Sequence, residues 1–232
     1  MSENMKKYVF LHNPKCAGTT MHGYLPNNDW HNLNAPLSIE KHFNTQMLTA
    51  CLDDHQYGCK VHHFTLEQHK NMNIFEEDEF LSAWKFTFVR NPFDRLVSEY
   101  HYSYDTFLMD NPSFDGKNIS FETFVERVEK VVNKRDYYKW YGPIQPNHVC
   151  PQHLYVYGDD DIVVTDYVGK VENFDNDVQK VFEVLGLQPP AEVSKINTTP
   201  KRNRYREYYN SETKKTVERI YEKDLNLFNY EF

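Results

Sequence analysis

Apolar residues along this chain come in short runs that predict β-strands. The clearest runs are Tyr8–Leu11 and Trp84–Val89, and polar or turn-forming residues bound each of them. Weaker extended segments are expected at 59–63, 162–165 and 168–172.

Between these runs, apolar residues recur every three to four positions, which predicts helices. Asn91 can cap the clearest of them, and Pro92 suits its first helical position. Its expected inward face consists of Phe93, Leu96, Val97, Tyr100 and Tyr104. The other expected helices span 19–25, 38–52, 76–82, 120–132, 174–185 and 211–227. Strands that alternate with helices predict an α/β fold whose central, mostly parallel sheet is covered on both faces.

The composition favours a single folded domain over residues 1–232. The chain is 40% hydrophobic and 16% aromatic, which is enough to build a sizeable core. Its formal net charge of −8 argues against general nucleic-acid binding, which needs a basic surface. We therefore expect no nucleic-acid partner.

The cysteines and the start of the chain bear on its location. Cys16, Cys51, Cys59 and Cys150 show neither C-x-x-C pairing nor zinc-type spacing, so we expect free thiols in a reducing compartment and no metal. The first strand begins at Tyr8, which leaves no room for a secretory signal, and no apolar stretch reaches membrane-spanning length. A cytoplasmic protein without a membrane partner is expected.

The loop after the first strand has the features of a phosphate site. A turn at Asn13-Pro14 leads through Lys15 into small and hydroxylated residues that open the next helix. Free N–H groups and the helix dipole favour an anion there, and Lys15, Thr19 and Thr20 add a charge and hydroxyl donors. The Walker A pattern is absent, so a nucleotide-like anion is expected but not ATP hydrolysis.

A second anion site is expected after the next strand. Arg90 follows that strand directly, where open α/β sheets place ligands, and Ser98 lies roughly 10 Å further along the helix. A phosphate that touches both must lie along the helix flank. The alternative is that Arg90 pairs with a carboxylate and Ser98 has no special role.

These two segments resemble motifs of the sulfotransferases that use 3′-phosphoadenosine 5′-phosphosulfate (PAPS), most closely the carbohydrate-sulfotransferase branch. The matching stretches are 14–20, 90–100, 168–174, 205–209 and 224–232. The resemblance implies a P-loop-like, three-layer fold, with PAPS as donor and 3′-phosphoadenosine 5′-phosphate (PAP) as product. It implies that the 3′-phosphate is bound by Arg90 and Ser98, and the 5′-phosphosulfate by Pro14, Lys15, Cys16, Ala17, Gly18, Thr19 and Thr20.

The first loop departs from the commoner P-K-T-A-G-T-[ST] in having Cys16. A phosphate contact through the backbone tolerates this change. A contact through a side-chain hydroxyl at this position would be lost.

The resemblance also implies the catalytic groups. Lys15 would stabilise the negative charge that grows on the leaving phosphate. A hydroxyl acceptor needs a general base, and His63-Phe-Thr65 matches a His-x-Thr pattern that some members carry. His63 therefore ranks above His62, whose ring would face the other way on an extended segment, and above Glu67.

Other segments have two interpretations each. Lys201 and Arg202 would close over the donor phosphates, or form a solvated charge run. His148, Gln152 and His153 belong to a segment that could face the acceptor, and no metal-ligand spacing includes them. Stacking on sugar rings or core packing would explain Tyr137, Tyr138, Trp140 and Tyr141.

The sequence thus predicts transfer of a sulfonate from PAPS to a hydroxyl-bearing acceptor, most simply a carbohydrate. A nucleotide or small-molecule kinase of the same superfold is disfavoured, because neither Walker A nor a carboxylate suited to Mg²⁺ is apparent. The remaining alternative is a PAPS- or glycan-binding module without turnover, which need not keep Lys15 and His63.

Overall fold

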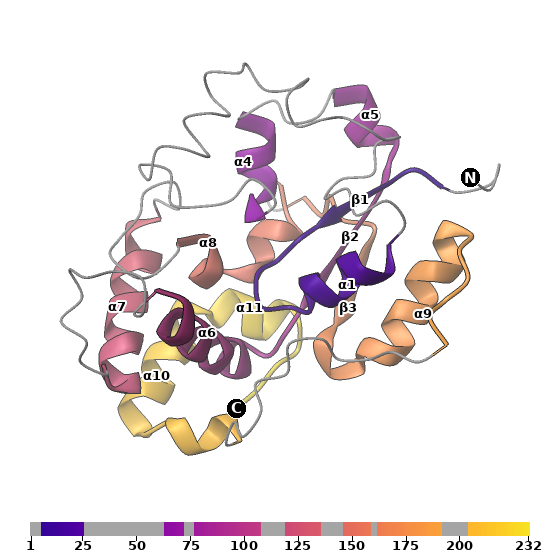
Figure 1. Ribbon diagram of the computed structural model, residues 1–232. Helices are drawn as coiled ribbons and strands as arrows, with labels where there is room; N and C mark the ends of the chain where they lie inside the picture. Colours follow the sequence, from indigo (N-terminus) through magenta and orange to yellow (C-terminus); the bar gives the residue numbers. More distant parts are fainter. Residues whose placement is uncertain are drawn as a thin grey trace.

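A computed structural model describes residues 6–25, 63–71, 77–107, 119–135, 146–158, 162–191 and 204–232. Three parallel strands form its sheet in the order β1-β2-β3, with bounds β1 Tyr8–Leu11, β2 Trp84–Val89 and β3 Tyr167–Lys170. Tyr8 pairs in register with Trp84, and Phe86 with Tyr167. The predicted α/β fold with a parallel sheet is confirmed (Figure 1).

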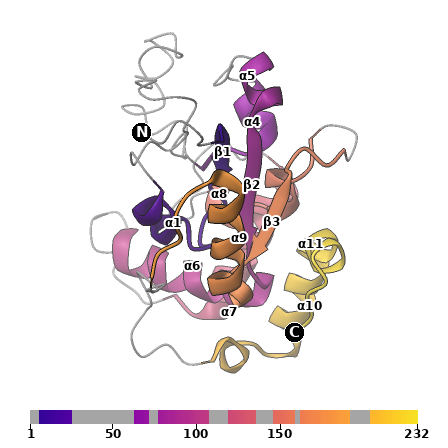
Figure 2. The same cartoon turned by 90° about the vertical axis from the view of Figure 1, so that its right-hand side faces the viewer.

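The two faces of the sheet bury different helices because side chains alternate along each strand. Tyr8 and Phe10 pack with α1 (Gly18–Tyr24) and α9 (Phe174–Leu185), which cover one face (Figure 2). Val9 and Leu11 point the other way, toward α4 (Leu66–Asn71) and α5 (Glu77–Ser82). The expected three layers are therefore present.

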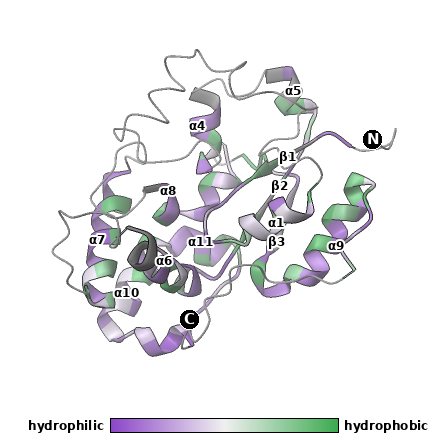
Figure 3. Cartoon of the chain, viewed as in Figure 1, coloured by the Kyte–Doolittle hydropathy of each residue, from purple (hydrophilic) through white to green (hydrophobic). Residues whose placement is uncertain are grey.

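A second core lies among helices beyond the carboxyl ends of the strands. It joins α6 (Pro92–Phe107), α7 (Phe121–Lys134) and α10 (Ser211–Ile220). Of the expected inward face of α6, Phe93, Leu96 and Val97 are fully buried here. Figure 3 shows apolar and polar residues alternating along α7 and α9, as expected for helices with one buried face.

Helix caps agree with the sequence. The Oδ1 atom of Asn91 accepts a hydrogen bond from the backbone N–H of Phe93 at 3.0 Å, and Ser120 caps α7 through the N–H of Thr123. Gly186 ends α9 in the left-handed conformation at φ 69°. The short remaining elements are α8 Pro146–Val149, η2 Gln152–Tyr155, η4 Val171–Asn173, η5 Tyr205–Tyr208 and α11 Glu222–Leu227.

The strand expected at 162–165 is wrong. Only Val163 in that segment pairs, in an isolated antiparallel bridge with Tyr157, and the third strand is β3. The expected extended run 168–172 is cut short because residues from Val171 turn into a 3₁₀ helix. The segment has apolar β-branched residues, but Ile162 and Val163 are exposed, so these two side chains lack the packing that favours a strand.

The final helix expected at 211–227 is two helices that meet at Tyr221. The side chain of Tyr221 is buried, and its hydroxyl donates to the Val149 carbonyl at 2.5 Å. The backbone of Tyr221 leaves helical geometry, with φ −117° and ψ 22°, so α11 starts a new direction.

Near the predicted catalytic base, His63 has helical rather than extended backbone, so the strand 59–63 is wrong at its last residue. The expected alternation of side chains along a strand therefore does not determine the direction of the His63 ring. Helix α4, which follows it, was not expected. Residues 59–62 and the expected helix 38–52 lie outside the described residues.

Candidate functional site

The carboxyl ends of the three strands meet at one edge of the sheet, which is where open α/β folds bind ligands. The loop after β1 and the residues after β2 lie side by side there, although they are 75 positions apart. The Nη1 atom of Arg90 donates to the carbonyl of Lys15 at 3.3 Å. The fold thus joins the two segments that the sequence marked as anion sites.

The backbone of the first loop is curled. Lys15 and Ala17 both have left-handed conformations, at φ 64° and φ 63°, which non-glycine residues seldom adopt. Turns of this kind direct successive N–H groups to one side and form a concave anion site. Since α1 has only seven residues, this loop, and not the dipole of the helix, is the candidate anion site.

Gly18 is required at the start of α1. A Cβ atom there would lie 1.9 Å from Nε2 of His12, whose ring covers the glycine. Of the two threonines that follow, Thr19 is exposed and Thr20 is buried.

Cys16 points beneath the loop, away from its open side. Its Sγ donates to the side-chain carbonyl of Gln152 at 3.2 Å and lies 3.5 Å from the Pro14 carbonyl. Burial raises the pKa of the thiol to about 12, so it stays protonated at neutral pH. Any contact between this position and a bound phosphate would therefore have to come from the backbone of Cys16. Within the described residues, Cys16 and Cys150 are free thiols, as expected.

Gln152 connects both segments through one buried amide. Its Oε1 accepts from Asn13 at 3.2 Å and from the backbone N–H of Arg90 at 2.9 Å. Its Nε2 donates to the Arg90 carbonyl at 2.8 Å. The carboxylate of Asp224 in α11 accepts from the backbone N–H of Gln152 at 2.6 Å. The side chain thus supports the site from below and does not face an acceptor.

Arg95 is a functional candidate that the sequence analysis missed. It is 1% exposed, and it donates through Nε to the Pro14 carbonyl at 3.1 Å and through Nη1 to the Cys150 carbonyl at 2.8 Å. No carboxylate of the described residues forms an ion pair with it. Its charge therefore adds positive potential under the first loop. The signal was the second arginine of Arg90-Asn-Pro-Phe-Asp-Arg95.

Arg90 is paired with a carboxylate, as the alternative interpretation held. Its Nε and Nη2 atoms lie 2.7 and 2.6 Å from Oδ2 of Asp94, one helical turn on. The pair fixes the plane of the guanidinium beside the first loop. Ser98 lies partly buried on α6, and its hydroxyl forms no hydrogen bond with the described residues.

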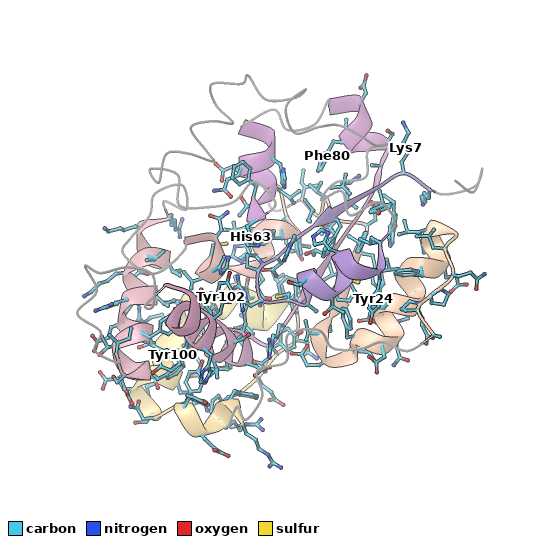
Figure 4. All side chains as sticks on the ribbon, viewed as in Figure 1. Lys7, Tyr24, His63, Phe80, Tyr100 and Tyr102 are labelled. Atoms are coloured by element: carbon cyan, nitrogen blue, oxygen red, sulfur yellow. The ribbon has the colours of Figure 1, made fainter. Side chains whose placement is uncertain are left out.

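The ammonium group of Lys15 lies over the ring of Tyr102, 3.9 Å from its centroid. This contact is a cation–π interaction, and it fixes the direction of a long side chain. The Tyr102 ring also lies against the His148 ring, with 5.4 Å between centroids. Tyr102 therefore connects the predicted leaving-group lysine to the histidines. Tyr102 and His63 are both labelled in Figure 4.

His63 is buried within a row of histidines. Its Nδ1 lies 3.0 Å from Nε2 of His148, and its ring meets the His12 ring edge-on at 4.8 Å. His148 in turn contacts the carboxylate of Glu99 at 3.0 Å. The sequence did not single out His12 or Glu99, although Glu99 lies in the matching stretch 90–100 and His12 directly follows the first strand.

His22 extends this row, with its Nε2 3.2 Å from Nδ1 of His12. Burial lowers the pKa of His22 to about 4, so the folded protein holds its ring neutral.

The His22 ring of the unfolded chain binds a proton near pH 6.5. The free energy of unfolding should therefore fall as the pH drops from 6.5 to 4, by about 3 kcal/mol for this group. Urea unfolding across this range measures it. His22→Gln should flatten the pH dependence, and an unchanged slope would contradict the assignment.

Several predicted residues cannot be placed or lie elsewhere. His62, Lys201 and Arg202 are outside the described residues, as are Tyr137, Tyr138, Trp140 and Tyr141. Glu67 is exposed on α4. The ring of His153 is held by Asp224 at 2.7 Å, which gives it a structural partner.

Within the described ranges, no cluster of three or more histidine, cysteine, aspartate or glutamate side chains is arranged to hold a metal ion. The helices described here also lack the length and apolar character needed to cross a bilayer.

The parallel sheet, the curled loop after β1 and the charged residues after β2 define an α/β protein of the P-loop-like class. Comparison with known families places it further: residues 2–231 match the sulfotransferase family, and the chain belongs to that family. No curated protein and no solved structure matches the chain. The membership supports a transferase that moves sulfonate groups.

Proposed function

We propose that the protein transfers the sulfonate group of PAPS to a hydroxyl of a carbohydrate acceptor. The observation that carries the proposal is the convergence of Lys15, Arg90 and His63. Arg90 contacts the backbone of Lys15, and Lys15 contacts the tyrosine that packs on the partner of His63. The proposed donor site and the candidate base are thus linked by these contacts.

The residues present fit a doubly phosphorylated donor. The curled backbone of Pro14, Lys15, Cys16 and Ala17, followed by the first turn of α1, would hold the 5′-phosphosulfate. Arg90 and Ser98 would hold the 3′-phosphate along the flank of α6, and Lys201 and Arg202 remain candidates to cover it. Buried Arg95 adds charge from beneath, which suits a ligand with several negative charges.

In the proposed reaction, His63 takes the proton from the acceptor hydroxyl. The acceptor oxygen forms a bond to sulfur, and the bond between sulfur and the bridging oxygen breaks. The electron pair stays on the 5′-phosphate of PAP, where Lys15 stabilises the charge. The lysine acts selectively because that charge is greater in the transition state than in bound PAPS.

The acceptor class is supported by resemblance alone. The ordered motifs at 14–20, 90–100 and 168–174 resemble those of the carbohydrate branch most closely, and this resemblance supports the proposed acceptor. Any hydroxyl placed against His63 would undergo the same chemistry, so the acceptor is the less constrained half of the proposal.

The donor is tested by thermal unfolding with PAP and, separately, with ATP and Mg²⁺. At a hundredfold excess over its dissociation constant, PAP should stabilise the protein by about 2.7 kcal/mol, which raises Tm by roughly 5–10 °C. Adenosine 5′-phosphate, which lacks the 3′-phosphate, should give a smaller rise, and Arg90→Ala should reduce the difference between the two. A larger shift with ATP and Mg²⁺ would contradict the proposal.

A further inference from the structure

Three buried side chains from three separate elements form a continuous hydrogen-bonded row. Glu99 lies on α6, His148 on α8 and His63 just before α4. Their exposed fractions are 0%, 3% and 8%. Oε2 of Glu99 lies 3.0 Å from Nδ1 of His148, and Nε2 of His148 lies 3.0 Å from Nδ1 of His63.

With Glu99 ionised and both imidazoles neutral, this row has a single order of protons. An ionised Glu99 can only accept, so His148 must donate from Nδ1. A neutral His148 then has its lone pair on Nε2 and accepts from Nδ1–H of His63. The remaining nitrogen of His63, Nε2, carries a lone pair. The carboxylate therefore selects the form of His63 that can take a proton.

The backbone of His63 is held as firmly as its ring. Its carbonyl accepts hydrogen bonds from Nδ2 of Asn147 at 2.7 Å and from the hydroxyl of Tyr155 at 2.8 Å. Asn147 and His148 are neighbours on α8, so one short helix positions both the backbone and the ring. Such double support is typical of a group whose orientation matters.

Other titratable groups surround the row. The ring of His12 meets His63 edge-on at 4.8 Å, and Tyr102 lies against His148 at 5.4 Å. The ammonium group of Lys15 lies over the Tyr102 ring, so Tyr102 is in contact with both this cation and His148. Among the described contacts of the two rings, Glu99 is the group that brings a negative charge.

We infer that Glu99 and His148 are positioning residues that hold His63 with its lone pair on Nε2 and stabilise its imidazolium when the acceptor proton arrives. This role rests on the proposed function, in which His63 is the base. It follows the logic of other carboxylate–histidine pairs, in which the carboxylate orients the ring and does not itself take the proton. Here a second histidine lies between the carboxylate and the base.

The test is Glu99→Gln, measured by steady-state kinetics and by ¹⁵N NMR of the histidine rings. An amide can donate as well as accept, so it permits the reversed hydrogen-bond order and places a proton on Nε2 of His63. We expect kcat to fall roughly 10²-fold, less than the ~10⁴-fold loss when an aspartate directly next to the base is amidated. The KM for PAPS should change by less than about threefold, since the row does not belong to the proposed donor contacts. The NMR spectrum should show His63 protonated on Nδ1 in the wild type and on Nε2 in the variant.

Matched variants separate positioning from general damage. Glu126→Gln changes an exposed glutamate on α7 and should leave kcat unchanged. His148→Gln keeps an acceptor near Nδ1 of His63, whereas His148→Phe removes it, so the glutamine variant should keep the higher kcat. Equal losses in both His148 variants would indicate a packing role and overturn the inference.

The NMR readout does not depend on turnover. A wild-type His63 protonated on Nε2 would overturn the inference even if Glu99→Gln failed to fold. Full kcat in a folded Glu99→Gln would also overturn it. Absence of PAP binding and of sulfonate transfer in the wild type, with His63 protonated on Nδ1, would instead reject the proposed function while the hydrogen-bond order stands.

Discussion

Replacing Lys15 with alanine is expected to lower kcat for sulfonate transfer by roughly 10²–10³-fold, the usual cost of removing one preorganised group that stabilises developing charge. The ammonium group of Lys15 is directed by the Tyr102 ring and lies in the loop proposed to bind the 5′-phosphosulfate. Steady-state assays with PAPS measure the loss. The KM for PAPS should change less than kcat, because the bridging oxygen gains most of its charge only as the bond to sulfur breaks.

Lys130→Ala provides the matched control for this variant. Lys130 is exposed on α7, so its removal takes away the same charge and chain length at a distance from the site. It should leave kcat unchanged. If Lys15→Ala turned over at the wild-type rate, the leaving-group role would have to be given to another cation of the site.

Replacing His63 with alanine is expected to lower kcat by roughly 10²–10⁴-fold, the range for loss of a general base. The stabilisation by PAP should persist, because His63 belongs to the acceptor side of the proposed site. Kinetics combined with PAP-dependent unfolding therefore separates loss of chemistry from loss of donor binding.

Glu67→Gln tests the competing base. Glu67 is exposed on α4, four positions after His63. Its substitution should have little effect on kcat. An unchanged rate for His63→Ala together with a strong loss for Glu67→Gln would move the role to the glutamate. If neither His63→Ala nor Glu67→Gln changed kcat, His62 would become the candidate base.

The sequence predicted the parts of the fold that depend on local pattern. The apolar runs of β1 and β2 and the cap at Asn91 were recognisable because a buried strand and a helix start leave signals within a few residues. The extended run expected at 168–172 overlaps β3, but the bounds of β3 were not predicted because they are set by pairing with β2 and not by local composition. The break at Tyr221 was also missed, since its apolar spacing is that of a continuous helix.

The candidate site was predictable where motifs carried it. Lys15, Arg90 and His63 were all identified by spacing or resemblance, and their roles remain predictions. The supporting groups were not identified, because Glu99 and Arg95 have ordinary positions on α6 and His12 follows β1 directly. Their significance comes from contacts between residues about 50–90 positions apart, such as Glu99 with His148, which no local pattern encodes.

Gln152 has a consequence for how the donor is selected. Its single amide holds the side chains of Asn13 and Cys16 on the first loop and the backbone of Arg90 on the other segment, so the two segments proposed to bind the donor are fixed relative to each other. A nucleotide that contacts only one of the two segments gains binding energy from that segment alone. The protein nevertheless keeps both segments fixed. Under the proposed function, discrimination between adenine nucleotides would thus depend on Gln152, although no nucleotide is proposed to touch it.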